Sequence, residues 1–215
     1  MSCPLCLSST PPSHYHSDKK RDYLQCHHCS LVYVSPDYLP SKEQEKQEYD
    51  LHENNFEDEG YKTFLRKLVT PLMSIIKELS SEELRGLDFG CGPAPVLASM
   101  LEDEGIQMNT YDPFYANTPQ ALEQHYNIIT CTEAIEHFHT PHKEWALLTT
   151  LLATEGVLAI MTKRVIDKAR FANWHYKNDI THVSFFSVAT FEFLARRDGL
   201  DVSFPENDVV LMRKR

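Results

Sequence analysis

The stretch Leu87-Asp88-Phe89-Gly90-Cys91-Gly92-Pro93-Ala94-Pro95 determines how this chain of 215 residues folds. It closes a short apolar run that starts at Leu84, and it leads into Val96–Leu101, which suits a buried helix. The two glycines let the backbone approach a bound ligand, because no Cβ blocks the approach, and the amides at the helix start face that ligand. We therefore predict a strand, a glycine-bearing turn and a helix, with a ligand at the turn.

A second predicted strand, Gln107–Tyr111, ends next to Asp112. This aspartate lies 22 positions after Gly90 and 20 after Gly92. An acid at that distance sits at the tip of the neighbouring strand, where it can accept hydrogen bonds from a ribose. A tight turn that binds no ligand is the structural alternative, and the complete strand–turn–helix–strand–Asp unit favours the ligand.

Two ligand classes fit this turn. A nicotinamide or flavin dinucleotide favours G-x-G-x-x-G/A, in which the third small residue allows close helix packing, and this chain has Pro95 there. Asp88–Gly92 instead resembles motif I of class I S-adenosylmethionine (SAM)-dependent methyltransferases, D-x-G-x-G-x-G, with Ala94 in place of the third glycine. The resemblance implies that the turn binds the methionine part of SAM and that Asp112 binds its ribose. The residues it implies as cofactor-binding are Asp88, Gly90, Cys91, Gly92, Asp112, Glu133 and Ala134.

Composition limits the classes of function. The net charge of -10 and the isoelectric point of about 5.5 exclude a bulk basic surface for nucleic acid, although a local patch stays open. Hydrophobic residues make up 42% of the chain, which supports the core of one α/β domain plus a small module. No apolar run approaches the length of a membrane span, and Met1–Pro4 has no signal-peptide pattern. We expect no membrane association and a cytoplasmic location.

Four of the six cysteines form two C-x-x-C pairs with 19 residues between them. Each pair can direct two sulfurs at one ion, and two such pairs complete a tetrahedral zinc site with four thiolates. The alternative is two redox or disulfide pairs, which an intracellular location disfavours. We predict about one structural zinc per chain, and its ligands are Cys3, Cys6, Cys26 and Cys29.

The order of predicted elements indicates an α/β fold, that is, a Rossmann-like class I methyltransferase sheet with a small amino-terminal zinc-binding module. We place the zinc module at residues 1–40, a helical linker and cap at 41–80, and the SAM-dependent methyltransferase domain at 81–215. The final two strands form a hairpin, so the last strand runs antiparallel. The predicted strands are 23–26, 31–34, 84–89, 107–111, 126–131, 157–161, 200–204 and 209–212, and the predicted helices are 42–48, 61–79, 96–101, 120–124, 141–152 and 190–197. Residues 112–126 leave no room for the further helix and strand usual in class I methyltransferases.

A second group of polar residues, Thr132–Phe138, comes directly after the strand 126–131. If this segment is helical, Glu133, Glu136 and His137 share one face. The E-x-x-E-H run resembles ubiquinone-pathway O-methyltransferases and small-RNA 2′-O-methyltransferases, in which it is linked to a divalent metal. In the RNA enzymes a later histidine completes the site, and His182 has a suitable position here.

Three interpretations of this group stay open. Glu133, Glu136, His137 and His182 bind a second divalent metal, with Mn, Fe or Zn suited better than Mg. Alternatively Glu136, His137 and His182 act catalytically, or orient the acceptor, without a metal. The third interpretation is purely structural.

Two segments mix aromatic, histidine and amide side chains without periodicity. We interpret Tyr49–Asn55 as either a ligand-facing loop or a plain linker. Residues 164–179 are interpreted as a cap over the site, with Trp174–Tyr176 lining the mouth for the substrate.

Residues 50–215 together resemble a bacterial class I SAM-dependent methyltransferase that carries a zinc-ribbon-like extension. Three functions remain. The first is methyl transfer to a small molecule, by O-methylation assisted by His137 or by a metal, and the acidic surface favours it. The second is an RNA methyltransferase that uses the zinc module to bind substrate, which a basic patch at Lys19, Lys20 and Arg21 would support. The third is a non-catalytic SAM-binding protein.

Overall fold

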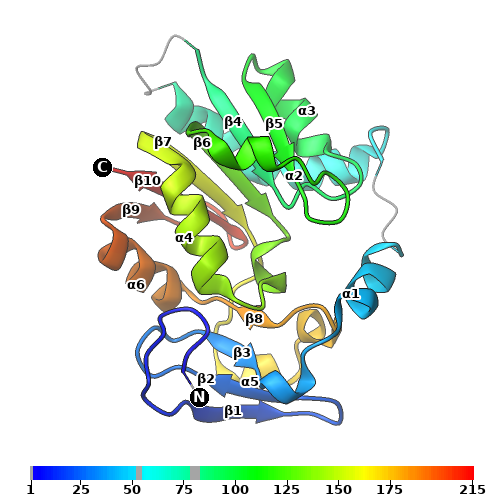
Figure 1. The fold of residues 1–215 in the computed structure, drawn as a ribbon, viewed down its shortest axis with the longest axis vertical. Coiled ribbons are helices and arrows are strands. Elements are labelled where there is room, and N and C mark those ends of the chain that lie inside the picture. Colours follow the sequence, from blue (N-terminus) through cyan, green and yellow to red (C-terminus); the bar gives the residue numbers. More distant parts are fainter. Residues whose placement is uncertain (1, 52–54, 78–82) are drawn as a thin grey trace.

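The computed structural model describes residues 2–51, 55–77 and 83–215. The strands of these ranges form two sheets, one of six strands and one of four (Figure 1). The predicted end of a helix at Leu79 and the predicted boundary at 80/81 lie outside the described residues, as does part of the segment Tyr49–Asn55. In the described ranges, no helix is both long and apolar enough to cross a membrane.

The six-stranded sheet has the order β5-β4-β6-β7-β10-β9. The first four strands of that order run parallel, and β10 pairs antiparallel with both β7 and β9. The strands are β4 (Arg85–Phe89), β5 (Gln107–Tyr111), β6 (Tyr126–Thr132), β7 (Leu152–Met161), β9 (Leu200–Ser203) and β10 (Val209–Lys214). The predicted parallel sheet with an antiparallel last strand is therefore confirmed.

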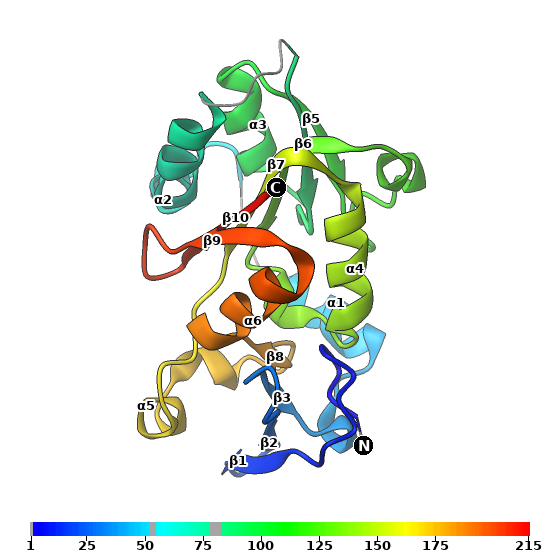
Figure 2. The ribbon, with the colours of Figure 1, turned by 90° about the vertical axis from the view of Figure 1, so that its left-hand side faces the viewer.

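Helices cover both faces of this sheet, as Figure 2 shows. Successive strand residues point to opposite faces, so Ile128 packs with the cluster under α2 and α3, and Ile129 packs with the cluster under α4 and α6. The sheet is thus buried on both sides, which parallel strands require. The covering helices are α2 (Glu59–Ile76), α3 (Val96–Asp103), α4 (Pro141–Leu151) and α6 (Val188–Asp198).

The interval between β5 and β6 is short, as predicted. Residues 112–126 are all described, and they form a 3₁₀ helix, η2 (Pro119–Glu123), with no strand longer than the single bridge Asp112–Ala116. The chain therefore passes from the end of β5 to the start of β6 through turns, without a further helix and strand.

The smaller sheet has the antiparallel order β1-β2-β3-β8. Three of its strands come from the amino terminus, namely β1 (Ser13–Ser17), β2 (Asp22–Gln25) and β3 (Val32–Val34). The fourth, β8 (Ser184–Phe185), comes from the last third of the chain and pairs with β3 beside it in Figure 1. The sequence predicted β2 and β3 but neither β1 nor this pairing. The segment between β7 and β8 carries α5 (Lys168–Ala172) and the 3₁₀ helix η4 (His175–Asn178).

Two short elements link the small sheet to α2. A 3₁₀ turn, η1 (Pro36–Tyr38), precedes α1 (Lys42–Tyr49), which was predicted as an exposed helix. The Ser41 hydroxyl accepts a hydrogen bond from the Gln44 amide while the Gln44 side chain accepts one from the Ser41 amide, so a capping box starts α1.

Candidate active site and zinc site

The glycine-bearing turn comes after β4 as predicted, and both glycines have a positive φ, +77° at Gly90 and +64° at Gly92. The Gly90 amide donates to the Tyr111 carbonyl at 2.8 Å, which ties the turn to the end of β5. A Cβ added at Gly90 would lie 2.6 Å from Cβ of Ala134, whereas one added at Gly92 would meet nothing within 4 Å. Gly90 thus permits a close approach to β6, and Gly92 borders open space.

Asp112 directly follows β5, at the position where the sequence predicted a residue that binds the ribose. Its Oδ2 accepts from the Gly92 amide at 3.1 Å, and its Oδ1 accepts from the amides of Phe114 at 2.8 Å and Tyr115 at 3.1 Å. The carboxylate therefore holds the glycine turn and its own loop together. A carboxylate offers about four acceptor positions, so one position remains for a ligand hydroxyl.

Asp88 is buried at the end of β4 and accepts a hydrogen bond from the Thr130 hydroxyl at 2.7 Å. Burial raises the pKa of Asp88 to about 6, although the Thr130 hydrogen bond opposes the rise. Burial, together with the Asp88 and Asp112 carboxylates, raises the pKa of the Cys91 thiol to about 12. Cys91 is therefore a neutral thiol beside an acidic turn. A cationic ligand group here would interact favourably with Asp88.

The end of β6 carries polar atoms without a partner. Among the described residues, Thr132 Oγ1 and Glu133 Oε1 are buried and make no hydrogen bond. Glu133 also has a φ of +46°, which is uncommon for a side chain other than glycine. Burial and the nearby Glu136 raise the pKa of Glu133 to about 8. Unsatisfied buried polar atoms and a strained backbone are typical of ligand sites.

Glu136, His137 and His182 come together. One ligating atom of each lies within 4.8 Å of the others. The His137 and His182 ring centroids are 4.7 Å apart. Glu136 is fully buried, and its carboxylate accepts hydrogen bonds from the hydroxyls of Tyr176 and Thr162.

Both histidines are oriented by backbone carbonyls of one segment. His137 Nδ1 lies 3.2 Å from the Thr181 carbonyl oxygen, and His182 Nδ1 lies 2.7 Å from that of Tyr176. A carbonyl only accepts, so each Nδ1 carries a proton, and in the neutral ring of His137 this leaves the lone pair on Nε2. Burial lowers the pKa of His137 below its ordinary value, despite the opposing effect of Glu136. The neutral imidazole can serve as a base or as a metal ligand.

The condition under which Glu133, Glu136 and His137 would share one helical face is not met. The segment forms a single 3₁₀ turn, η3 (Ile135–His137), in which three residues complete a turn. Glu133 lies before this turn, and it is not part of the cluster of three ligating atoms formed by Glu136, His137 and His182. Glu133 therefore lies near Glu136 but outside the group of three ligating side chains.

Several aromatic residues surround the cluster. The Tyr49 ring of α1 packs edge-on against the rings of His137 and Phe114, with ring centroids 5.2 Å and 5.6 Å apart. Trp174 instead packs with Phe171 and Phe185 in the core under the small sheet. The sequence predicted Tyr176 at the mouth for the substrate and Tyr49 in a ligand-facing loop or a linker, but it predicted no contact of either with the cluster. It gave no signal for Thr130 or Thr162, because a threonine at the end of a strand is ordinary.

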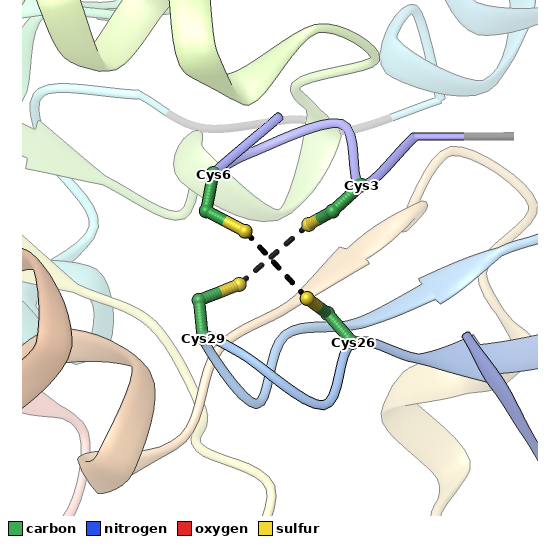
Figure 3. A group of neighbouring side chains, drawn as sticks. All are labelled: Cys3, Cys6, Cys26 and Cys29. Atoms are coloured by element: carbon green, nitrogen blue, oxygen red, sulfur yellow. Dashed lines mark hydrogen bonds between the residues drawn. The ribbon is translucent and has the colours of Figure 1, made fainter. Parts of the chain in front are cut away.

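The four predicted zinc ligands converge, as Figure 3 shows. The sulfurs of Cys3 and Cys29 are 3.6 Å apart, as are those of Cys6 and Cys26, and all four lie within 4.8 Å of one another. These separations exceed a disulfide bond of roughly 2 Å and approach the ~3.8 Å edge of a tetrahedron with Zn–S bonds of about 2.3 Å. Three of the four cysteines are buried, so the donor set fits one zinc ion.

The basic patch that would support an RNA substrate lacks one of its three members. Arg21 is only 6% exposed, and its guanidinium donates to backbone carbonyls of the segment 177–182. It is therefore not available to a phosphate backbone. Lys19 and Lys20 remain exposed on this turn.

Comparison with known proteins identifies the family. A family described as a methyltransferase domain matches residues 58–203, well over half of the chain. The chain belongs to this methyltransferase family. The match starts at the N-cap residue of α2 and runs to the end of β9. A comparison with curated proteins found no match.

Solved structures agree with this family. A 1,6-didemethyltoxoflavin-N1-methyltransferase from Burkholderia thailandensis is 14% identical with a TM-score of 0.51, covering 94% of this chain and 98% of that one. A magnesium protoporphyrin IX methyltransferase from Synechocystis is 11% identical with a TM-score of 0.50, covering 83% of this chain and 94% of that one. Against an O-methyltransferase family protein from Burkholderia thailandensis, 14% identical with a TM-score of 0.48, the match covers 70% of this chain and 57% of that one. The first two matches confirm the Rossmann-like class I methyltransferase fold.

Proposed function

We propose that the chain is a SAM-dependent methyltransferase that methylates an oxygen of a small molecule. The observation that carries the proposal is the placement of two sites on adjacent strands. The glycine turn comes after β4, and the cluster of Glu136, His137 and His182 lies beyond the end of β6, which pairs directly with β4. Ligands of open α/β sheets bind at this edge, so a methyl donor and an acceptor can meet there.

Residues of the β4 and β5 ends fit the methyl donor. Gly92 borders open space, Asp112 keeps an acceptor position for a ribose hydroxyl, and Asp88 is a buried acid beside the turn. Cys91 is part of the same turn, Ala134 packs against Gly90, and Glu133 Oε1 is an unsatisfied acceptor beside them. When bound, SAM supplies a methyl carbon that its positive sulfur has already activated.

The acceptor side uses the histidines. His137 Nε2 takes the proton of the acceptor hydroxyl as its oxygen forms the bond to the methyl carbon and the carbon–sulfur bond breaks. Thr181 holds the tautomer that leaves Nε2 free, and burial keeps the ring neutral. Glu136 and His182 orient the acceptor. Correct positioning of donor and acceptor supplies most of the rate, because the methyl group is already reactive.

The cluster of Glu136, His137 and His182 also has the donor set of a site for Mn, Fe or Zn. Each histidine donates Nδ1–H to a carbonyl, an arrangement common for metal-ligating histidines. A bound ion would lower the pKa of the acceptor hydroxyl. Of the four residues proposed from the sequence, Glu133 is the least suited, since it lies outside the cluster.

The amino-terminal module is proposed to bind one structural zinc through its four cysteines. About forty residues bury little apolar surface, so the ion would supply much of the folding energy of this part. The named relatives of similar fold act on small molecules, a toxoflavin precursor and a magnesium porphyrin. This supports a small-molecule acceptor over RNA, as does the burial of Arg21.

Calorimetric titration with SAM tests the donor site, with Asp112→Ala as the variant expected to lose affinity. Transfer of labelled methyl from SAM into a small-molecule cell extract, and separately into total RNA, then identifies the acceptor class. Label in the small-molecule pool supports the proposal. Label only in RNA would establish the RNA alternative, and SAM binding without transfer would establish a non-catalytic SAM-binding protein.

A further inference from the structure

We propose that Arg21, in the amino-terminal module, is a positioning residue for the candidate acceptor site, because it fixes the backbone of residues 176–182. The inference rests on the proposed function of His137 and His182. It assigns the small sheet a task within the methyltransferase, namely holding the segment that orients both histidines.

The Arg21 guanidinium is surrounded by carbonyl oxygens. Nη1 donates to the carbonyls of Ile180 at 3.0 Å and His182 at 3.1 Å, and Nη2 donates to those of Asp179 at 2.9 Å and Lys177. These partners are more than 150 positions away in the chain. Four carbonyls from one short segment converge on one planar cation, whose fork of N–H donors matches them.

Two further carbonyls of the segment contact the histidines. The Tyr176 carbonyl accepts from His182 Nδ1, and the Thr181 carbonyl lies 3.2 Å from His137 Nδ1. The carbonyls of this one segment thus contact both the two imidazoles and Arg21. A shift of the backbone would change both histidine contacts at once.

Other contacts hold the same segment to the module. Lys177, 5% exposed, places its Nζ 3.1 Å from Asp18 Oδ2. The Tyr23 hydroxyl lies 3.0 Å from the same carboxylate oxygen, and the Val34 amide donates to the Val183 carbonyl at 2.9 Å. Burial opposes ionisation of Asp18, but hydrogen bonds from the Lys20 and Arg21 amides and from Lys177 lower its pKa well below the ordinary range.

Arg21 is the residue whose loss this arrangement tolerates least. Without a cation, four carbonyl dipoles would point at one another in a site with little water, and each would lack a donor. The segment would then rearrange to reach water. A lysine has a compact ammonium with three donors, so it can satisfy only part of the ring.

Hydrogen exchange of the full-length, zinc-loaded protein tests the inference. In Arg21→Gln the amides of residues 177–183 should exchange about tenfold faster or more, while those of β6 stay unchanged. In Arg21→Lys the exchange rates of the same amides should lie between those of the wild type and those of Arg21→Gln. Lys20→Gln, which removes a charge from the same turn, should match the wild type. Zinc content and SAM affinity should be unchanged in all variants. If the amides of residues 177–183 exchange at the wild-type rate in Arg21→Gln, the inference is overturned. If Arg21→Gln does not fold, wild-type exchange rates in Arg21→Lys would overturn it instead.

A double-mutant cycle with His182→Ala adds a readout that a merely structural role would not move. The rate of labelled methyl transfer from SAM into the small-molecule extract should fall in Arg21→Gln without a change in KM for SAM. When Arg21→Gln is added to His182→Ala, the rate should fall by a smaller factor than in the wild-type background, because only the His137 contact is then left to lose. Full additivity would overturn the inference. If His182→Ala alone retains full turnover, the proposed acceptor site fails, and the exchange experiment still decides the role of Arg21.

Discussion

Gly90 and Ala134 face each other across the ends of β4 and β6, and a Cβ at Gly90 would stand 2.6 Å from that of Ala134. Real Cβ atoms do not approach so closely, so the two strands can be this near only with glycine at position 90. The contact places the end of β6, with the unsatisfied Glu133 Oε1, directly beside the glycine turn.

Gly90→Ala should therefore destabilise the protein and abolish SAM binding. The positive φ costs about 1 kcal/mol, and the clash with Ala134 adds to it. Gly105→Ala is the matched control, because Gly105 has a φ of +87° and no atom within 4 Å of the added Cβ. For Gly105→Ala, denaturant unfolding should show a free energy of unfolding that is lower by about 1 kcal/mol. Calorimetry should show that its SAM affinity is normal. Equal behaviour of the two variants would contradict the close approach.

Asp88→Asn should raise the free energy of unfolding of the ligand-free protein at neutral pH. The folded pKa of Asp88 is about 6 against 3.8 unfolded. A carboxyl group whose pKa is higher in the folded than in the unfolded protein stabilises the fold fully at pH values below its unfolded pKa. This stabilisation is lost as the pH rises through its folded pKa. The asparagine can still accept from Thr130 and escapes that loss, which amounts to about 3 kcal/mol at most.

Unfolding by denaturant from about pH 4 to about pH 7 measures this difference. The gain of Asp88→Asn over the wild type should grow between pH 4 and 6 and stay constant above. A gain that does not change with pH would show that Asp88 titrates normally.

Cys29→Ser should reduce zinc from about one ion per chain to near zero, because a hydroxyl replaces one of four thiolates. Metal analysis and thermal unfolding should show the loss together with a lower Tm. Cys91→Ser is the control, since Cys91 lies in the glycine turn and not in the cysteine cluster. Disulfides at the four cysteines, detected by mass spectrometry in freshly purified protein, would contradict the zinc site.

The rate of methyl transfer should fall on the acid side with an apparent pKa below 6.5, the ordinary value of histidine. Burial lowers the pKa of His137, so its imidazole stays neutral and able to take a proton down to that lower pH. His137→Gln should lose this acid limb along with most of the rate. An acid limb that is unchanged in His137→Gln would assign the base to another group.

The predictable part of this protein is the part encoded locally. The strand, glycine turn, helix and Asp112 lie within one run of 26 residues, from Leu87 to Asp112, and their pattern of apolar residues and glycines predicted them correctly. The two C-x-x-C pairs have a spacing typical of a four-cysteine zinc site, and their four sulfurs converge in the structure. Local pattern and local chemistry agree in both cases.

The contacts that escaped prediction join distant segments. β8 has two residues, too short for any periodicity, and its place is set by pairing with β3. Arg21 reads as a surface residue in a polar turn, and its carbonyl partners lie more than 150 positions later. In the 3₁₀ turn at Ile135–His137 each hydrogen bond spans three residues, whereas in an α-helix it spans four. The sequence alone does not distinguish these two kinds of turn.

The most direct test of the account is a crystal structure with S-adenosylhomocysteine. The account predicts the nucleoside at the carboxyl ends of β4 and β5, with a ribose hydroxyl on Asp112 and its amino-acid part beside Gly90 and Gly92. An empty edge at saturating ligand, or a dinucleotide retained there from the cell, would contradict it.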